Sequence, residues 1–121
     1  MSRMLPAEVV DAYNSTCLIP IRLAWNTRND RGGCAIAAVA QHRGVSLDEV
    51  RNEFPTRYEE GFLYAWDAEE PRREFYIDKI KKEDDEMVTR GFCDGLLCRS
   101  AVESAYSSAL IPITATDTKE S

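Results

Sequence analysis

Two segments of the chain, thirty residues apart, repeat the same pattern of apolar and small residues. These residues recur at positions i, i+3, i+4, i+7 and i+8, which is the spacing of one face of an α-helix. The first set comprises Tyr58, Gly61, Phe62, Ala65 and Trp66, and the second comprises Val88, Gly91, Phe92, Gly95 and Leu96. Glycine in a helix costs about 1 kcal/mol relative to alanine, so glycines at matching positions predict a close approach of two backbones. We therefore expect the two helices to pack on each other or on a second copy of the chain. The packing residues are predicted to be Gly61, Phe62, Ala65, Gly91, Phe92 and Gly95.

Two further helices are predicted in the first half of the chain. Leu5–Thr16 is amphipathic, and Pro6 stands in its first turn, where an amide hydrogen would have no partner within the helix. Cys34–Arg43 is apolar nearly all round and stops at Gly44, which is typical of a buried helix with a glycine C-cap. We expect this second helix to be the central one.

Two consecutive capping boxes predict the helices that follow. In a capping box a Ser or Thr side chain accepts a hydrogen bond from the third helical amide, and a Glu side chain reaches back to the cap. Ser46 with Glu49 predicts a helix that is ended by Pro55, and Thr56 with Glu59 predicts the start of the first glycine-containing helix. That helix is expected to run to about residue 69. The second glycine-containing helix is expected to start in the acidic run 83–86 and to continue through residue 106.

Residues 18–25 predict an extended segment, because Pro20 resists helix formation and β-branched and aromatic residues gather there. Since proline lacks an amide hydrogen, we expect an edge strand. Residues 26–33 concentrate turn formers and predict a surface loop, such as the tip of a hairpin. Residues 72–82 fit either a helix or a strand, and we favour the helix.

These elements predict a mainly α, or α+β, fold with about five helices and a short extended segment near residues 18–25. A chain of 121 residues with 44% hydrophobic residues is long and apolar enough for one core. Residues 1–112 are expected to form a single helical domain. Residues 113–121 show no pattern and are expected to form a flexible tail.

The net charge of −6 opposes direct binding to nucleic acid or to an anionic membrane surface, because both repel an acidic protein. The N-terminus shows no apolar signal region, and no stretch approaches the roughly 20 apolar residues that cross a bilayer. We therefore expect a cytoplasmic protein. Its four cysteines are expected to be reduced and mostly buried: Cys17, Cys34, Cys93 and Cys98.

The segment Arg31-Gly32-Gly33-Cys34, followed by residues 43–51, resembles the nucleophile region of bacterial papain-like cysteine peptidases of the bacteriocin-processing type. In that family a cysteine at a helix N-terminus is acidified by the helix dipole. The family also needs a histidine base far downstream. The single histidine here, His42, lies eight residues from Cys34 on the same predicted helix, about 12 Å along its axis. The two side chains cannot form a hydrogen-bonded pair, so we expect Cys34 to be structural and predict no catalytic residue.

Metal and cofactor sites are not predicted. One histidine cannot build a histidine-based zinc site, and Cys93 and Cys98 are too far apart around a helix to act as a C-x-x-C pair. A site made from all four cysteines is geometrically possible. Gly32 and Gly33 precede a helix N-terminus and could bind an anion through backbone amides, although a simple turn is the favoured interpretation.

Acidic residues gather in the middle third of the chain, at 59–60, 67–70 and 83–86. Such runs could imitate the phosphate spacing of DNA and block a basic groove. However, basic residues at 72–73 and 79–82 are interleaved with them, which favours ordinary solvated faces.

The order of short motifs along the whole chain resembles that of a scattered set of small uncharacterised bacterial and bacteriophage proteins. The residues that carry the resemblance are Leu5, Pro6, Val9, Ala12, Tyr13, Gly33, Cys34, Gly61, Phe62, Asp67, Gly91, Phe92, Asp94 and Gly95. The resemblance implies a shared fold and no particular activity.

Taken together, the patterns predict a non-enzymatic acidic protein that binds a protein partner or a second copy of itself. Its contact site is predicted at an aromatic and acidic rim, because amphipathic aromatic residues beside charge are typical of interface hot spots. The rim comprises Tyr58, Tyr64, Trp66 and Asp67. Two alternatives stay open, a DNA-mimic inhibitor of a nucleic-acid-binding protein and a cysteine-dependent enzyme.

Overall fold

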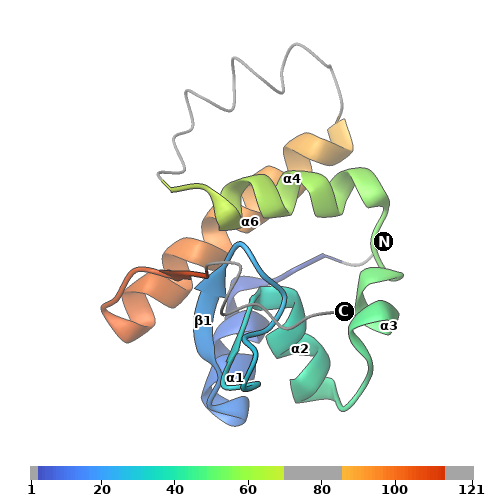
Figure 1. Ribbon diagram of the computed structural model, residues 1–121. Helices are drawn as coiled ribbons and strands as arrows, with labels where there is room; N and C mark the ends of the chain where they lie inside the picture. The colour runs from blue at the N-terminus through green and yellow to red at the C-terminus, as the bar shows by residue number, and fades with distance from the viewer. Residues whose placement is uncertain (1–2, 70–85, 114–121) are drawn as a thin grey trace.

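The computed structural model describes residues 3–69 and 86–113 (Figure 1). These residues form five helices and a three-stranded parallel sheet. The prediction of a mainly α fold with about five helices is therefore confirmed. The predicted helix at 72–82 and the predicted tail beyond residue 113 lie outside the described residues, and the extent of the domain stays a prediction.

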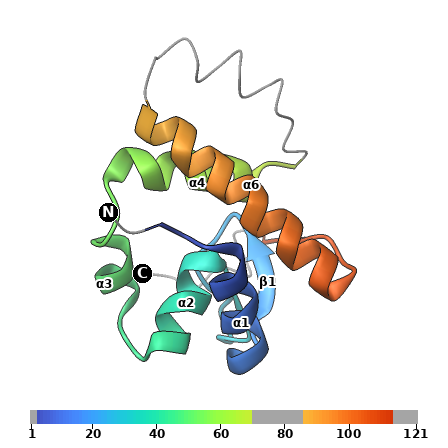
Figure 2. The same ribbon diagram turned by 180° about the vertical axis from the view of Figure 1, so that it is seen from behind.

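Helix α1 (Pro6–Thr16) and helix α2 (Ala35–Arg43) pack side by side, below the two glycine-containing helices in the view of Figure 2. Pro6 stands in the first turn of α1, as its fixed φ favours. Helix α2 ends at Gly44, whose φ of 72° is the left-handed conformation that glycine adopts without strain. Six consecutive residues of α2, from Ala35 to Ala40, are buried, so the expectation that it is the central helix is met.

Helix α3 (Leu47–Arg51) starts at the first predicted capping box, where the Ser46 hydroxyl accepts from the Glu49 amide at 3.2 Å. The second predicted capping box is wrong. Helix α4 (Thr56–Asp67) has Pro55 at its N-cap, and Thr56 is already helical. The Glu59 carboxylate turns to the Arg51 guanidinium at 2.7 Å, and this ion pair replaces the bond back to the cap.

Helices α4 and α6 (Glu86–Tyr106) cross at close range within the chain (Figure 1). A Cβ atom built on Gly91 would lie 1.9 Å from the Tyr58 carbonyl oxygen, and one on Gly61 would lie 2.0 Å from the Val88 carbonyl oxygen. Gly95 faces Phe62 and Ala65 in the same way. The backbones approach so closely that no side chain fits between them at these positions.

The sheet joins strands β1 (Ile19–Arg22), β2 (Gly32–Gly33) and β3 (Ile111–Pro112) in the order β2-β1-β3. The predicted extended segment is thus a strand, but the expectation of an edge strand is wrong because β1 is central. The Ile19 amide bonds to the β2 side, and the Arg22 carbonyl bonds to β3. Backbone groups alternate along a strand, so the Pro20 nitrogen faces the β3 side, where pairing starts only at Ile21. The missing amide hydrogen of Pro20 therefore costs no ladder bond.

The expectation of a surface loop over residues 26–33 is wrong at its end, because Gly32 and Gly33 form the buried strand β2, which pairs with β1 in parallel. The preceding loop folds back on β2 by antiparallel pairing. Asn26 bridges Gly33, and the Thr27 amide donates to the Gly32 carbonyl at 3.0 Å. Aromatic side chains then bind the sheet to the helices. The Trp66 indole donates to the Ile21 carbonyl at 2.8 Å, and the Tyr13 hydroxyl donates to the Gly33 carbonyl at 2.7 Å.

Candidate functional site

The predicted aromatic and acidic rim is not a surface. Tyr58 and Trp66 are buried in the core, so they are not available to a partner. Tyr64 is exposed, since it lies two residues and about 200° around the helix from Trp66. Asp67 is half-buried, its carboxylate accepts from the Leu23 amide at 2.9 Å, and burial raises its pKa. The predicted rim is therefore not one continuous exposed surface, because two of its four residues are in the core.

The Tyr58 hydroxyl belongs to a buried polar cluster that ties the N-terminal segment to α4 and α6. It donates to Asp94 at 2.5 Å and accepts from the Met4 amide at 2.9 Å, and burial raises its pKa. The Arg3 guanidinium donates one hydrogen bond to each oxygen of the Asp94 carboxylate, at 3.1 and 2.7 Å. These bonds satisfy the buried Asp94 carboxylate and link the N-terminal segment to α4 and α6.

The only other buried charged residue among those described is Arg99, and its role is structural. Its guanidinium donates to the carbonyls of Ala65 and Trp66 at 3.1 Å and also bonds the Ala68 carbonyl. These are orphan carbonyls at the end of α4, which has no backbone cap within the helix. No local pattern in the sequence indicates this role, because the carbonyls that Arg99 binds lie about 30 residues earlier in the chain.

The environment of Cys34 does not support a nucleophile. The thiol is buried at the N-cap of α2, and burial raises its pKa to about 12. A nucleophilic cysteine needs the opposite shift, toward a thiolate at neutral pH. His42 lies at the far end of α2, where its Nδ1 atom is 2.5 Å from the exposed hydroxyl of Ser15.

Two other sites that the sequence left open find no support. Within residues 3–69 and 86–113, no cluster of three or more His, Cys, Asp or Glu side chains could hold a metal ion. At the glycine pair, the Gly32 amide donates to the Thr27 hydroxyl and the Cys34 amide donates to the Trp25 carbonyl. The amides of Gly32 and Cys34 are therefore occupied within the protein.

Three carboxylates in the described part of the acidic runs form ion pairs with arginines. Glu59 pairs with Arg51, Glu60 with Arg57 and Glu86 with Arg90. An ion pair removes much of the field that an imitation of DNA would require.

A different surface emerges where the sheet meets solvent. The register pairs Ile21 with Ile111, and side chains two residues apart share a face, so Ile19, Ile21, Ile111 and Ile113 lie on one side of β1 and β3. We call these four residues the isoleucine face. Together with the loop 27–32 it lines a groove of about 550 Å³. Ile19 and Ile111 are 46% and 47% exposed, a large fraction for residues of this type.

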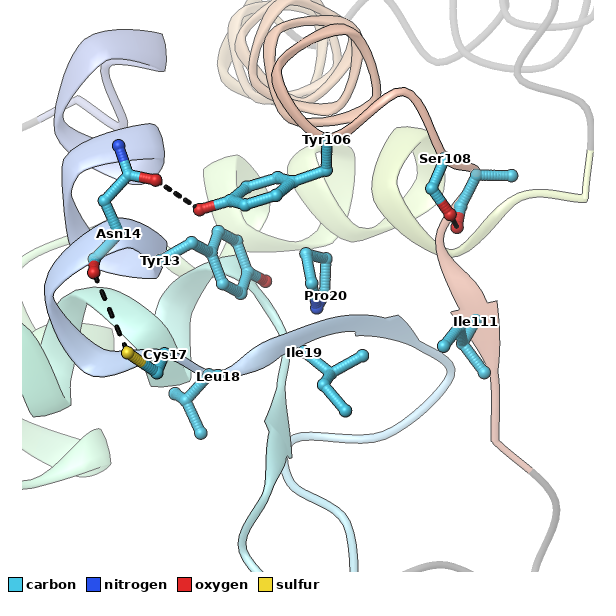
Figure 3. A pocket seen from close by; sticks show the side chains of 10 residues that line it. Tyr13, Asn14, Cys17, Leu18, Ile19, Pro20, Tyr106, Ser108 and Ile111 are labelled. Atoms are coloured by element: carbon cyan, nitrogen blue, oxygen red, sulfur yellow. Dashed lines mark hydrogen bonds between the residues drawn. The ribbon is translucent and has the colours of Figure 1, made fainter.

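A second hollow, of about 350 Å³, adjoins the same two isoleucines on the helix side of the sheet (Figure 3). In Figure 3, Pro20 points toward the helices and Ile19 points away from them, as alternation along the strand requires. Tyr106, which is 39% exposed, forms part of the wall, and its hydroxyl donates to the Asn14 side chain at 2.5 Å. Ile19 and Ile111 thus separate two adjoining hollows.

Two arginines border the isoleucine face. Arg28 and Arg31 are exposed, line the groove and form no ion pair with any residue in the described part of the chain. The signal for this surface in the sequence was the apolar residues at 19, 21, 111 and 113, which alternate as in strands. Because about 90 residues separate the two pairs, the pattern alone could not show that they form one face.

Comparisons of the chain with protein-family models, curated proteins and solved structures give no match. The resemblances to peptidases and to small phage proteins therefore stay predictions. No helix in the described part combines the length and the apolar character needed to cross a membrane.

The four thiols are expected to fall into two classes of reactivity. Cys17 and Cys93 are exposed, whereas Cys34 and Cys98 are buried, and burial raises the pKa of each buried thiol to about 12. We expect iodoacetamide at about pH 8 to label the first pair in native protein and all four cysteines in urea. Mass spectrometry of peptides measures this, and rapid native labelling of Cys34 would contradict it.

The same shift predicts an alkaline loss of stability. The folded-state pKa of both buried thiols lies above the ordinary value of 9.0, so the folded state holds its protons more tightly than the unfolded chain. The free energy of unfolding should therefore fall as pH rises from about 9 toward 12. Replacing both residues by alanine should make that part of the pH profile shallower in urea titrations, and the remaining fall should come from the buried tyrosines Tyr13 and Tyr58, whose pKa burial also raises.

Proposed function

We propose that this chain is a non-enzymatic protein-binding module whose contact surface is the isoleucine face with Tyr106. One observation carries the proposal: three exposed large apolar side chains, Ile19, Tyr106 and Ile111, gather around two adjoining hollows. Contiguous exposed apolar surface marks binding sites, whereas single exposed apolar residues do not. Aromatic and arginine side chains beside it match the composition of protein interfaces.

The two alternatives from the sequence are less well supported. A cysteine-dependent enzyme needs an ionised thiol, and Cys34 is held in the opposite state. A DNA mimic needs free carboxylates, whereas Glu59, Glu60 and Glu86 are paired. We place the protein in the cytoplasm, since all four of its cysteines are free thiols, as a reducing compartment favours. With a net charge of −6, we expect its partner to be a protein rather than nucleic acid.

Site-specific photo-crosslinking tests this function. A benzoylphenylalanine at position 111 should yield a discrete adduct in cell extract. The same probe at Leu97 should yield none, because Leu97 is equally exposed, at 56%, but lines neither of the two hollows. Excess unlabelled protein should compete, and an Ile19→Asp/Ile111→Asp variant should not. Equal adducts at both positions, or equal competition by the variant, would refute the proposal.

A further inference from the structure

We infer that the groove on the isoleucine face takes an acidic, aliphatic segment of the partner, with Arg28 and Arg31 binding its carboxylates. The inference rests on the proposed function and adds the chemistry of the partner. The groove supplies an apolar floor on which Ile19 and Ile111 are exposed and Ile113 is partly exposed, with Ile21 buried beneath them, and it supplies two cations from the loop 27–32. A segment that places aliphatic side chains on the floor and carboxylates toward the wall would satisfy both.

Arg28 and Arg31 differ in their partners from all the other arginines that the structure describes. Each of those has a carboxylate or carbonyl partner: Arg3, Arg22, Arg43, Arg51, Arg57, Arg90 and Arg99. Arg28 and Arg31 have none among residues 3–69 and 86–113, although the chain carries 21 acidic residues against 15 basic ones. Guanidinium groups bind carboxylates with two parallel hydrogen bonds, so this pair is suited to an external acidic group.

The loop that bears the arginines is held in place before any partner arrives. The Asn29 side chain accepts from the Thr27 hydroxyl at 2.7 Å and from the Arg31 amide at 3.1 Å. The Gly32 amide donates to the Thr27 hydroxyl, and a Cβ on Gly32 would lie 2.9 Å from Ile21. The backbone next to each arginine is therefore fixed against the groove, which lowers the entropy lost on binding.

The backbone of β3 argues against recognition by strand addition. The Ile113 amide bonds to β1, so by alternation the Pro112 nitrogen faces away from the sheet. Proline has no amide hydrogen to donate there, so an added strand would lose a backbone hydrogen bond at this edge. We therefore expect the partner to bind through side-chain contacts with the isoleucine face and not through backbone pairing with β3. Pairing of this face with itself would gather the unpaired arginines of two copies in one interface, which disfavours a two-fold dimer.

A display library of random peptides is the probe that tests the inference. Peptides selected on the wild-type protein and eluted by the soluble protein should be enriched in Asp and Glu next to Ile, Leu or Val. Their affinity should fall about tenfold or more in the Arg28→Gln/Arg31→Gln variant, and should also fall as salt rises. The control is Arg57→Gln/Arg90→Gln, which changes the net charge equally on surface ion pairs elsewhere and should alter affinity less than about twofold.

The outcomes separate the two proposals. Selected peptides that need Ile111 but carry no acidic preference would overturn the inference and leave the proposed function standing. Selected peptides that bind an Ile111→Asp variant equally well would overturn both, provided that circular dichroism shows that variant to be folded. A concentration-dependent dimer that Ile111→Asp dissociates would identify a second copy as the occupant and overturn the acidic segment.

Discussion

Replacing Gly91 with alanine is expected to lower the free energy of unfolding by about 3 kcal/mol, because the new methyl group would meet the Tyr58 carbonyl at 1.9 Å. The sign alone is informative, since the same change in an unconstrained helix stabilises it by about 1 kcal/mol. The Tyr58 carbonyl belongs to the backbone and cannot rotate away from the new methyl group as a side chain could. The two helices must therefore separate, which leaves gaps beside Phe62 and Phe92. Urea titration followed by circular dichroism measures the effect.

The matched control is Ser100→Ala, an exposed position on the same helix, which should change stability by less than about 0.5 kcal/mol. Gly61→Ala should resemble Gly91→Ala, because its methyl group would meet the Val88 carbonyl. Both changes open the same gap, so the double variant should cost less than the sum of the single variants. Additive effects, or a stabilised Gly91→Ala, would contradict the close packing of α4 and α6.

Replacing Arg99 with methionine is expected to cost about 3 kcal/mol or more. Methionine keeps the apolar stem but removes every donor, and the carbonyls of Ala65, Trp66 and Ala68 at the end of α4 then lose their partner. A buried acceptor left without a hydrogen bond costs about 1–3 kcal/mol. Lysine should not restore stability, because a single ammonium group cannot reach several carbonyls as a planar guanidinium does.

Arg90→Met provides the comparison on the same helix. Arg90 is exposed and pairs only with Glu86 one turn away, so its loss should cost less than about 0.5 kcal/mol. Thermal or urea unfolding of both variants measures the difference. Equal stabilities would show that Arg99 does not hold the end of α4.

Local patterns in the sequence determined most of the helices. The apolar periodicity of α4 and α6, the proline in the first turn of α1, the Gly44 cap and the Ser46 cap each involve residues within two turns of one another. Interactions of that range can be read along the chain. The repeated small residues also pointed to α4 and α6 as packing partners.

Only the tertiary structure decided the candidate site. Tyr58 and Trp66 are amphipathic, so the pattern allowed either a core or a surface position, and packing against α6 and the sheet placed both inside. The isoleucine face joins β1 with β3, which the chain separates by about 90 residues, and a pairing of that range leaves no local mark. The sequence determined which residues could bind a partner through their chemistry. The fold determined which of them meet solvent together, because exposure depends on contacts between distant segments.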